Sequence, residues 1–384
     1  MAQIATQPKT YRIVVSLENS HKLDMGLGEF ENSIATRLAR RAPELKARYG
    51  ITLCFLVAKG HEGAYGPDVE YMSISRNRRR LINFSRFVHV SHWLIPHIDL
   101  LHYTNQFFKF KARLAPVQLL TVHDLNYLHN SIGRMRLMKK NFLTRQRLGR
   151  ATQLTFISDF ARHDVEQHFH TGKPSRVIKN GVTNLNTEPQ QVYDRVLSDM
   201  GLQPGYLFHI SRLASKKSVH LIVEMMHHLP HERLVVAGTG RKSYVDRLHA
   251  LVEQYHLTNV QFVGRVSTLQ KAALLSRCKA LLFPSISEGF GLPVAEAMCF
   301  GRPVFITRLT SLPEVGGRNA YYFNTLQPDD MARTVEEGLN DFASSPEEKA
   351  KLLKQRAATF DWDTAVDQYV DYYLDLLKLK NASA

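Results

Sequence analysis

Two glutamates flank a glycine-rich turn in the segment 284–303, PSISEGFGLPVAEAMCFGRP. Glu288 and Glu296 lie eight positions apart, on either side of Gly289-Phe290-Gly291. Glycine lets a backbone approach a ligand without a Cβ in the way, and Pro293 suits the first turn of a helix. Free N–H groups at the start of that helix favour an anionic or hydroxylated ligand. A turn with two solvated glutamates is the alternative.

A second cluster follows the strand predicted at Tyr206–Ile210 and contains Arg212 and Lys217. An arginine offers a fork of N–H donors and a lysine a compact charge, so this pair before a helix at Val219–Met226 suits a diphosphate. Lys216 is the neighbour that competes for the role of Lys217. A solvated basic turn is the alternative.

Both clusters lie in a chain whose short apolar runs alternate with helical patterns. The first half opens with a strand at Tyr11–Leu17 and a helix over Glu29–Arg41. Further strands are predicted at Ile51–Val57, Leu100–Tyr103, Val117–Val122 and Leu154–Ile157, and in the second half at Tyr206–Ile210, Leu234–Ala237, Val260–Val263, Ala280–Phe283 and Pro303–Thr307. Strands that alternate with helices predict an α/β fold with parallel sheets.

The 384 residues suffice for two domains. We predict two Rossmann-like doubly wound domains that face each other across a cleft, one at 1–190 completed by the C-terminal helix 364–384, the other at 191–363. The three cysteines form neither a disulfide framework nor a C-x2-C cluster, which indicates a reducing compartment. No signal-peptide core and no apolar run near ~20 residues is present, so we expect a cytoplasmic protein.

The net charge of +15 comes entirely from the first half, where residues 1–180 hold 28 Lys and Arg against 13 Asp and Glu. Basic residues cluster at Arg76–Arg80 and Arg134–Arg150, and an apolar stripe of Met135, Met138 and Phe142 recurs at helical spacing in the second cluster. Cations beside such a stripe favour peripheral binding to an anionic membrane, or a lipid-linked acceptor, over a nucleic acid. A solvated basic helix that packs the stripe into the core is the alternative.

Several segments resemble, in order and spacing, the retaining glycosyltransferases of family 4 (glycosyltransferases group 1), which have GT-B architecture. The similarity to the second domain of that family is carried by SRLASKK, VVAGTG, FVGRVSTLQKAALLSRCKALLFPSISEGFGLPVAEAMCFGRPV and SLPEVGG, and the similarity to the first by TVHDLNYL, FISDFARHDV and VIKNGV. The resemblance implies a nucleoside diphosphate sugar as donor, bound chiefly by the second domain. It also implies a glycan or glycolipid acceptor bound chiefly by the first.

The resemblance further implies roles for single residues. Catalytic roles fall on His123, Arg212, Lys217 and Glu288, and donor contacts on Gly26, Gly28, Val266, Gly289, Phe290, Gly291, Leu292 and Glu296. Arg212 and Lys217 hold the diphosphate, and Glu296 binds the ribose hydroxyls. Glu288 and the amides of the turn hold the donor sugar, and Val266 lies by the base. His123 faces the donor sugar, with a packed histidine at a strand end as the alternative. Gly26 and Gly28 come about ten residues later than the family's usual glycine pair.

The leaving diphosphate gains negative charge as the glycosyl bond breaks, so fixed cations and helix N-terminal amides lower the barrier. We therefore expect no metal and no cofactor. The D-x-D of the chain, Asp361-Trp362-Asp363, precedes the last helix and is interpreted as its cap. Retention, as the family implies it, places the acceptor on the face that the phosphate leaves, so we name no protein nucleophile.

The favoured interpretation is a retaining hexosyltransferase that acts on a lipid-linked or envelope glycan, as in lipopolysaccharide or polysaccharide biosynthesis. GDP-mannose is favoured as donor, because SEGFGLPVAEAM with TSLPEVGG resembles the mannosyl-transferring branch, and a UDP-sugar stays open. A nicotinamide dehydrogenase is excluded because Glu31 replaces the third glycine after Gly26 and Gly28. A glycosidase with Glu288 and Glu296, or a basic nucleic-acid- or membrane-binding protein without transferase activity, are the alternatives.

Overall fold

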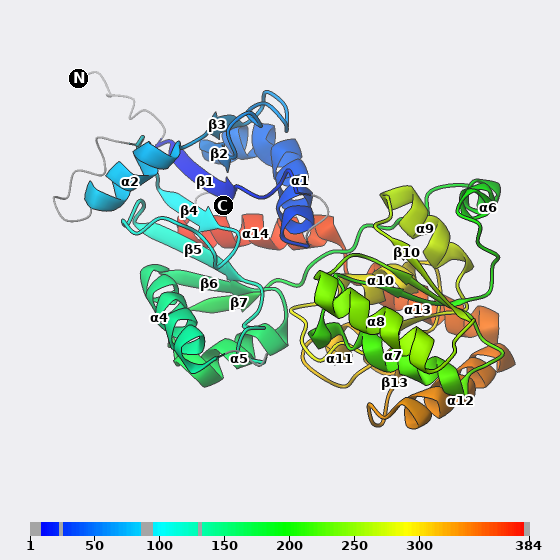
Figure 1. Cartoon of the computed structure of the whole chain (residues 1–384). Coiled ribbons are helices and arrows are strands. Elements are labelled where there is room, and N and C mark those ends of the chain that lie inside the picture. The colour runs from blue at the N-terminus through cyan, green and yellow to red at the C-terminus, as the bar shows by residue number, and fades with distance from the viewer. Residues whose placement is uncertain (1–8, 23–25, 86–94, 130–132, 380–384) are drawn as a thin grey trace, which may run out of the picture. The chain divides into compact units, whose positions relative to one another are not determined.

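The structure is a computed structural model that describes residues 9–22, 26–85, 95–129 and 133–379. The chain divides into two compact units (Figure 1). The first comprises Met1–His123, Ile132–Gly181 and Trp362–Ala384, and the second comprises Asp124–Ser131 and Val182–Asp361. The last helix thus belongs to the first unit. No helix among the described residues is long and apolar enough to cross a membrane.

The first unit contains a parallel sheet of seven strands in the order β3-β2-β1-β4-β5-β6-β7. Its strands are β1 (Tyr11–Leu17), β2 (Ile51–Val57), β3 (Glu70–Met72), β4 (Leu100–Tyr103), β5 (Val117–Val122), β6 (Gln153–Phe156) and β7 (Ser175–Val177). In the central register, Ile13 of β1 lies opposite Leu53 of β2 and Leu100 of β4. The sequence predicted five of these strands and missed the edge strands β3 and β7, which have three residues each.

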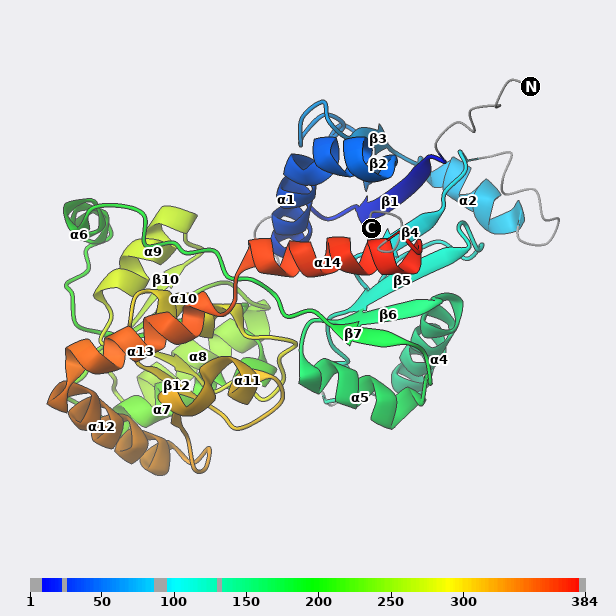
Figure 2. The same ribbon diagram turned by 180° about the vertical axis from the view of Figure 1, so that it is seen from behind.

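Five helices of the first unit are described here: α1 (Gly26–Tyr49), α2 (Arg76–Ser85), α4 (Arg134–Arg150), α5 (Asp159–Phe169) and α14 (Trp362–Leu376). The strand order reverses at β1, so right-handed crossovers place α1 on the opposite face from α4 and α5. The last helix, α14, runs beside α1 (Figure 2).

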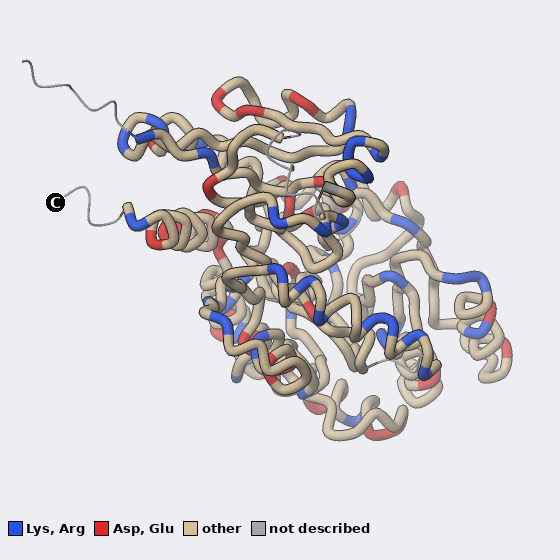
Figure 3. Tube along the Cα trace, turned by 90° about the vertical axis from the view of Figure 1, so that its left-hand side faces the viewer, with Lys and Arg blue, Asp and Glu red and all other residues tan. Residues whose placement is uncertain are grey.

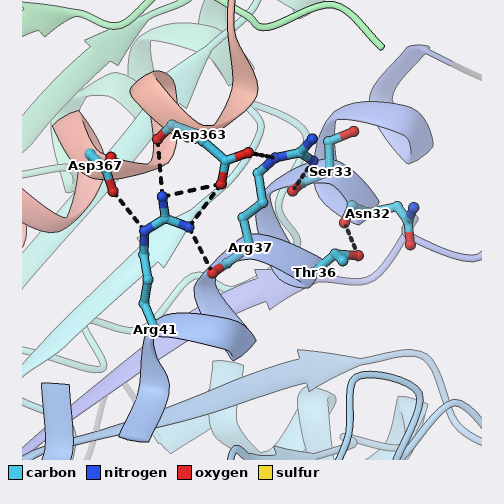
Figure 4. A network of polar contacts seen from close by, with 7 residues as sticks. All are labelled: Asn32, Ser33, Thr36, Arg37, Arg41, Asp363 and Asp367. Atoms are coloured by element: carbon cyan, nitrogen blue, oxygen red, sulfur yellow. Dashed lines mark hydrogen bonds and ion pairs between the residues drawn. The ribbon is translucent and has the colours of Figure 1, made fainter. Parts of the chain in front are cut away.

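Ion pairs and packing hold α14 against α1. Arg41 pairs with Asp367 at 2.6 Å and with Asp363 at 3.2 Å, and Arg37 pairs with Asp363 at 3.1 Å (Figure 4). Asp363 of the D-x-D therefore lies in the first turn of α14 as an ion-pair partner, and Asp361 directly precedes the helix. A Cβ on Gly181 would lie 2.4 Å from Trp362, so only glycine permits the chain to pass there.

The second unit contains a parallel sheet of six strands in the order β10-β9-β8-β11-β12-β13. Its strands are β8 (Leu207–Ile210), β9 (Leu234–Ala237), β10 (Val260–Gly264), β11 (Ala280–Phe283), β12 (Val304–Ile306) and β13 (Tyr321–Tyr322). Its α-helices are α6 (Gln190–Asp199), α7 (Val219–Met225), α8 (Lys242–Gln254), α9 (Thr268–Arg277), α10 (Leu292–Cys299), α11 (Leu312–Gly316), α12 (Pro328–Ser344) and α13 (Pro346–Ala358). The sequence missed only the two-residue β13 among these strands.

The core of the second unit fixes the strands whose ends carry the candidate site. Ile222 of α7, Leu248 of α8 and Val335 of α12 are fully buried in one cluster with Leu282 of β11 and Phe305 of β12. Each such side chain contributes ~1.5–3 kcal/mol on burial. The loops that leave β8 and β11 therefore start from a rigid base. Two alternating α/β sheets confirm the predicted fold class.

Candidate functional site

The two clusters predicted from sequence follow the two strands between which the order of the second sheet reverses. Arg212 and Lys217 follow β8, and Glu288 and the glycine turn follow β11, the neighbour of β8. Ligands of open α/β sheets bind outside the carboxyl ends of strands at this kind of switch point. The topology therefore brings together segments that lie about 70 residues apart in sequence.

An ion pair joins the two clusters. The Nζ of Lys217 contacts Oε1 of Glu288, and both side chains are largely buried. The same Nζ lies 5.2 Å from the ring centroid of Phe283, at the end of β11. Lys217 ends a short 3-10 helix, after which Ser218 adopts a left-handed conformation with φ +52°. The loop thus directs a lysine charge at the start of the glycine turn.

The two other cations of the β8 loop have different surroundings. Arg212 is exposed, and its side chain makes no hydrogen bond or ion pair with the residues that the structure describes. The main chain of Lys216 accepts a hydrogen bond from the N–H of Ile286 at 2.9 Å, which ties the β8 loop to the β11 loop. Burial, and after it the charge of Lys217, lowers the pKa of the Lys216 ammonium. Arg212 and Lys217 therefore fit an anion better than Lys216 does.

The glycine turn is held by hydroxyl groups from the loop after β12. The Oγ of Ser311 donates to the carbonyl oxygens of Glu288 at 3.2 Å and Phe290 at 2.9 Å. The N–H of Glu288 donates to Oγ1 of Thr310 at 3.1 Å. Gly291 has φ +110°, and a Cβ there would lie 2.8 Å from Leu312. Glycine is therefore required at Gly291 by both conformation and space.

The helix that follows the turn begins without a side-chain cap. Gly291 is the N-cap of α10, Leu292 is its first residue, and Pro293 lies in the first turn, as the sequence predicts. The ring of Phe290 is buried against Phe360, with centroids 5.3 Å apart at 88°. Phe290 can therefore serve a ligand only through its backbone, and Gly289 completes the turn.

Glu296 lies one turn further along α10 and is paired with a lysine that the sequence did not indicate. The Nζ of Lys271, on α9, lies 2.5 Å from Oε1 of Glu296, whose side chain is 3% exposed. A charge so deeply buried is stable only when it is paired. Lys271 and Glu296 lie 25 residues apart on two different helices, so no local pattern of the sequence could have predicted their pairing.

The remaining edge of the site is formed by the loops after β8, β9 and β10. Val266, in the loop after β10, is half-buried. Gly238, after β9, has φ +124°, and a Cβ there would lie 1.8 Å from the carbonyl oxygen of Ser211. His209, on β8, bonds the carbonyl of Leu282 through Nδ1 at 2.8 Å and Oγ of Ser211 through Nε2 at 2.7 Å. Burial lowers the pKa of His209 to about 4, so this histidine orients Ser211 as a neutral ring.

One segment of the sequence far from these loops also reaches the second unit. Asn126, in TVHDLNYL, accepts a hydrogen bond from Oγ of Ser287 at 2.5 Å. Ser287 immediately precedes Glu288, so Asn126 supports the backbone that presents that glutamate. Asn126 is not among the residues predicted for the site, although its segment TVHDLNYL carries part of the resemblance.

Three predicted site residues lie in the first unit. His123, at the end of β5, contacts the carbonyl of Thr104 through Nε2 at 2.8 Å, and its ring meets that of Phe30 edge-on at 4.5 Å. Gly26 and Gly28 lie in the first turn of α1, where a Cβ on Gly28 would lie 2.0 Å from the carbonyl oxygen of Lys22. Gly28 therefore permits close packing of α1 on the preceding loop. Among the described side chains, no group of three or more His, Cys, Asp or Glu could hold a metal ion.

Comparisons with known proteins agree with this geometry. Residues 199–359 match the family model of glycosyl transferases group 1. The sucrose-phosphate synthase of Thermosynechococcus elongatus superposes with a TM-score of 0.73 at 17% identity, covering 96% of this chain and 99% of that one. The Anabaena protein HepE, in a complex with UDP and glucose, gives a TM-score of 0.67 at 19% identity, covering 95% of this chain and all of HepE. The chain has the GT-B fold.

Curated relatives of this GT-B protein include two from Escherichia coli. The serotype-specific mannosyltransferase WbdA is 31% identical over 184 residues, which cover 46% of this chain and 22% of WbdA. The chain thus spans about a fifth of WbdA. The O-antigen chain mannosyltransferase B is 26% identical over 379 residues, which cover 91% of this chain and 95% of that protein.

Proposed function

We propose that this GT-B protein is a retaining glycosyltransferase that moves a hexose from a nucleoside diphosphate sugar to a glycan or glycolipid acceptor. The observation that carries the proposal is the Lys217–Glu288 pair at the switch point of the second unit, inside the segment that matches the family model. The names of the two Escherichia coli relatives favour a mannosyl donor and a role in O-antigen synthesis. The UDP and glucose bound to HepE keep a UDP-sugar open.

The proposed chemistry assigns the diphosphate to Arg212 and Lys217. Arg212 is exposed and without a bonded partner among the described residues, so it can offer its full fork of donors. Lys217 is already oriented by Glu288, so little reorganisation is needed when negative charge develops on the leaving group. We propose that these two cations stabilise the leaving diphosphate without a metal or cofactor.

The sugar and the ribose are assigned to the two glutamates of the E-x7-E segment. Glu288, with the amides of Gly289 to Leu292, would hold hydroxyls of the donor sugar. Glu296 would bind the ribose hydroxyls through the oxygen that Lys271 does not occupy. Val266 would lie by the base. The roles of His123, Gly26 and Gly28 towards donor or acceptor stay predictions from the resemblance.

The glycosidase alternative fits these contacts poorly. A glycosidase needs one of its two carboxyl groups protonated so that it can act as a general acid. Glu288 is paired with Lys217, and Glu296 with Lys271. In each pair one carboxyl oxygen contacts the lysine, and the ion pair holds the carboxyl group in place as an acceptor for hydroxyls.

The surface of α4 supports a membrane partner. Met135, Met138 and Phe142 are 86%, 64% and 61% exposed, so the stripe does not pack into the core, contrary to the alternative reading of the sequence. Lys and Arg residues recur along α4, which contains no Asp or Glu. Figure 3 colours the Lys and Arg residues of the chain blue and the Asp and Glu residues red. We propose that α4 binds an anionic membrane at its cytoplasmic face, which suits a lipid-linked acceptor better than a nucleic acid.

A ligand panel tests the donor assignment. Thermal unfolding of the full chain would be followed with UDP, GDP, their hexose conjugates and the matching nucleosides, with and without EDTA. Binding to the folded state raises the melting temperature in proportion to affinity, so one diphosphate series should raise it while the nucleosides do not. EDTA should leave the shift unchanged. If no nucleoside diphosphate or its hexose conjugate raises the melting temperature, the transferase proposal is wrong.

A further inference from the structure

The first unit contains a cavity of about 720 Å³ that the donor assignment does not use. It lies where the strand order of the seven-stranded sheet reverses, at the carboxyl ends of β1, β2 and β4. In the wall of this cavity, Ser16 is the last residue but one of β1, Val57 ends β2, and Asn105 follows β4. Arg76, Arg79, Arg80 and Asn83 of α2 also line it. The cavity therefore occupies the position at which open α/β sheets bind ligands.

The lining of this cavity is strongly basic. Six cations contribute to it: Lys22, Lys59, Arg76, Arg79, Arg80 and Lys109. The single carboxylate in the lining is Glu18, which pairs with Arg79. Arg79 also lies 5.3 Å from the ring centroid of Phe110. Arg79 is thus a fixed part of the wall, and its charge is balanced.

The other five cations have no such partner. Within the ranges that the structure describes, none of their side chains makes an ion pair or a hydrogen bond. Like charges gathered in one cavity repel one another and destabilise the fold unless an anion binds between them. His21, also in the lining, stacks on His61 at 4.7 Å. Burial, then His61 and then Lys22 lower the pKa of His21, as expected in a region of positive potential.

The size and the rim of the cavity narrow the ligand class. A volume of ~300–1,000 Å³ holds a molecule larger than one phosphate ion. Phe107, which lines the cavity, is 51% exposed. Cations that surround a cavity together with an exposed phenyl ring suit a phosphorylated molecule with a bulky remainder.

We propose that this cavity binds the phosphate groups of the acceptor, with Arg76 and Arg80 as their principal ligands. The proposal rests on the proposed transferase function and deepens it, because an uncharged glycan would leave these cations unpaired. Arginine forks match the oxygens of a phosphate in pairs, and lysines add charge. Lys22, Lys59 and Lys109 then surround the same anion. The phosphate belongs either to a lipid-linked diphosphate or to a phosphorylated sugar of the acceptor.

Titration calorimetry of the full chain with inorganic pyrophosphate tests the cavity and the donor site separately. Two binding events are expected, one in each unit. The double variant Arg76→Gln, Arg80→Gln should lose the first-unit event, with a rise in Kd of about tenfold or more. The double variant Arg212→Gln, Lys217→Gln should lose the other. A matched control, Arg40→Gln with Lys46→Gln on α1, removes two exposed cations of the first unit that do not line the cavity, and it should keep both events.

The outcomes separate the two proposals. If the Arg76 and Arg80 variant keeps both events at the parent Kd, or if the control weakens them equally, the cavity is not an acceptor site. If the Arg76 and Arg80 variant loses one event but the Arg212 and Lys217 variant keeps both, the donor assignment is wrong and the cavity proposal stands.

A second titration identifies the source of the phosphate. An alkyl diphosphate that binds more tightly than pyrophosphate, and whose binding is lost when Arg76 and Arg80 are replaced, supports a lipid-linked acceptor. Tighter binding of a hexose phosphate with the same dependence supports a phosphorylated sugar. Sulfate that binds as tightly as both overturns the proposal, because the cavity would then be an unspecific anion site.

Discussion

Replacement of Glu296 by glutamine should weaken nucleotide binding strongly while the fold survives. Hydrogen bonds to a charged group contribute about 1.5–3 kcal/mol, and glutamine keeps the shape but loses the charge. Each 1.4 kcal/mol is about tenfold, so the Kd of the nucleoside diphosphate should rise about 10- to 150-fold. Titration calorimetry with the nucleotide that gives the largest thermal shift measures this directly.

The matched control for this prediction is Lys271→Met, which breaks the same ion pair from the other side. It leaves a carboxylate that is 3% exposed without its cation, so the melting temperature should fall. Removing one partner of a fully buried pair costs about 3–5 kcal/mol, and water that reaches Lys271, which is 21% exposed, reduces this to about 1–3 kcal/mol. Nucleotide affinity should fall much less than in Glu296→Gln, since the lysine does not contact ribose.

Two results would refute the reasoning. Parent-like nucleotide affinity in a folded Glu296→Gln protein would show that Glu296 serves only as the partner of Lys271. Equal losses of affinity in both variants would show that the ion pair positions α9 and α10 and that no ribose contact exists.

Three further predictions concern other parts of the molecule. Arg212→Gln should lower turnover about a hundredfold with little change in melting temperature, because this exposed cation stabilises the leaving group and makes no contact that holds the fold. Equal losses of stability and activity would indicate a structural role. Glutamine at Arg134, Arg136, Lys139 and Lys140 should weaken sedimentation with anionic vesicles by about 1 kcal/mol per charge, and salt should release the parent protein; a parent that does not sediment at low salt contradicts the membrane proposal. Burial lowers the pKa of His102 to about 3 and of His209 to about 4, below their usual 6.5, so the unfolded chain binds more protons below pH 6.5. The free energy of unfolding should therefore be greatest above pH 6.5 and should fall towards pH 4, by up to about 1.4 kcal/mol per pH unit for each histidine. Urea unfolding of His102→Asn should show a shallower fall of this free energy with pH. An unchanged slope in the variant would contradict the prediction.

The sequence predicted long strands well because burial on both faces leaves a continuous apolar run, as in β1 and β2. It missed β3, β7 and β13 because strands of two or three residues are too short to show a pattern of alternating or continuous apolar residues. The clusters around Lys217 and Glu288 were predicted, since each is local, but their ion pair depends on the neighbouring positions of β8 and β11.

The charged surfaces show the same limit. The periodic stripe of α4 is consistent with either burial or exposure, and only the packing of the folded unit shows that Met135 is 86% exposed. The run Arg76–Arg80 is visible in the sequence. The order of the strands places this run beside Lys22, Lys59 and Lys109, and no local sequence pattern predicts that order.

The helix α14 makes the first unit dependent on a segment that is synthesised only after the second unit. The Nδ1 of His102 on β4 contacts the hydroxyl of Tyr373 at 2.7 Å, and Thr121 on β5 contacts that of Tyr369 at 3.2 Å. On the ribosome, these two sheet residues lack their tyrosine partners on α14 until the whole second unit has emerged. We expect the first unit to stay open to chaperones and proteases through that interval and to close only when Tyr369 and Tyr373 arrive.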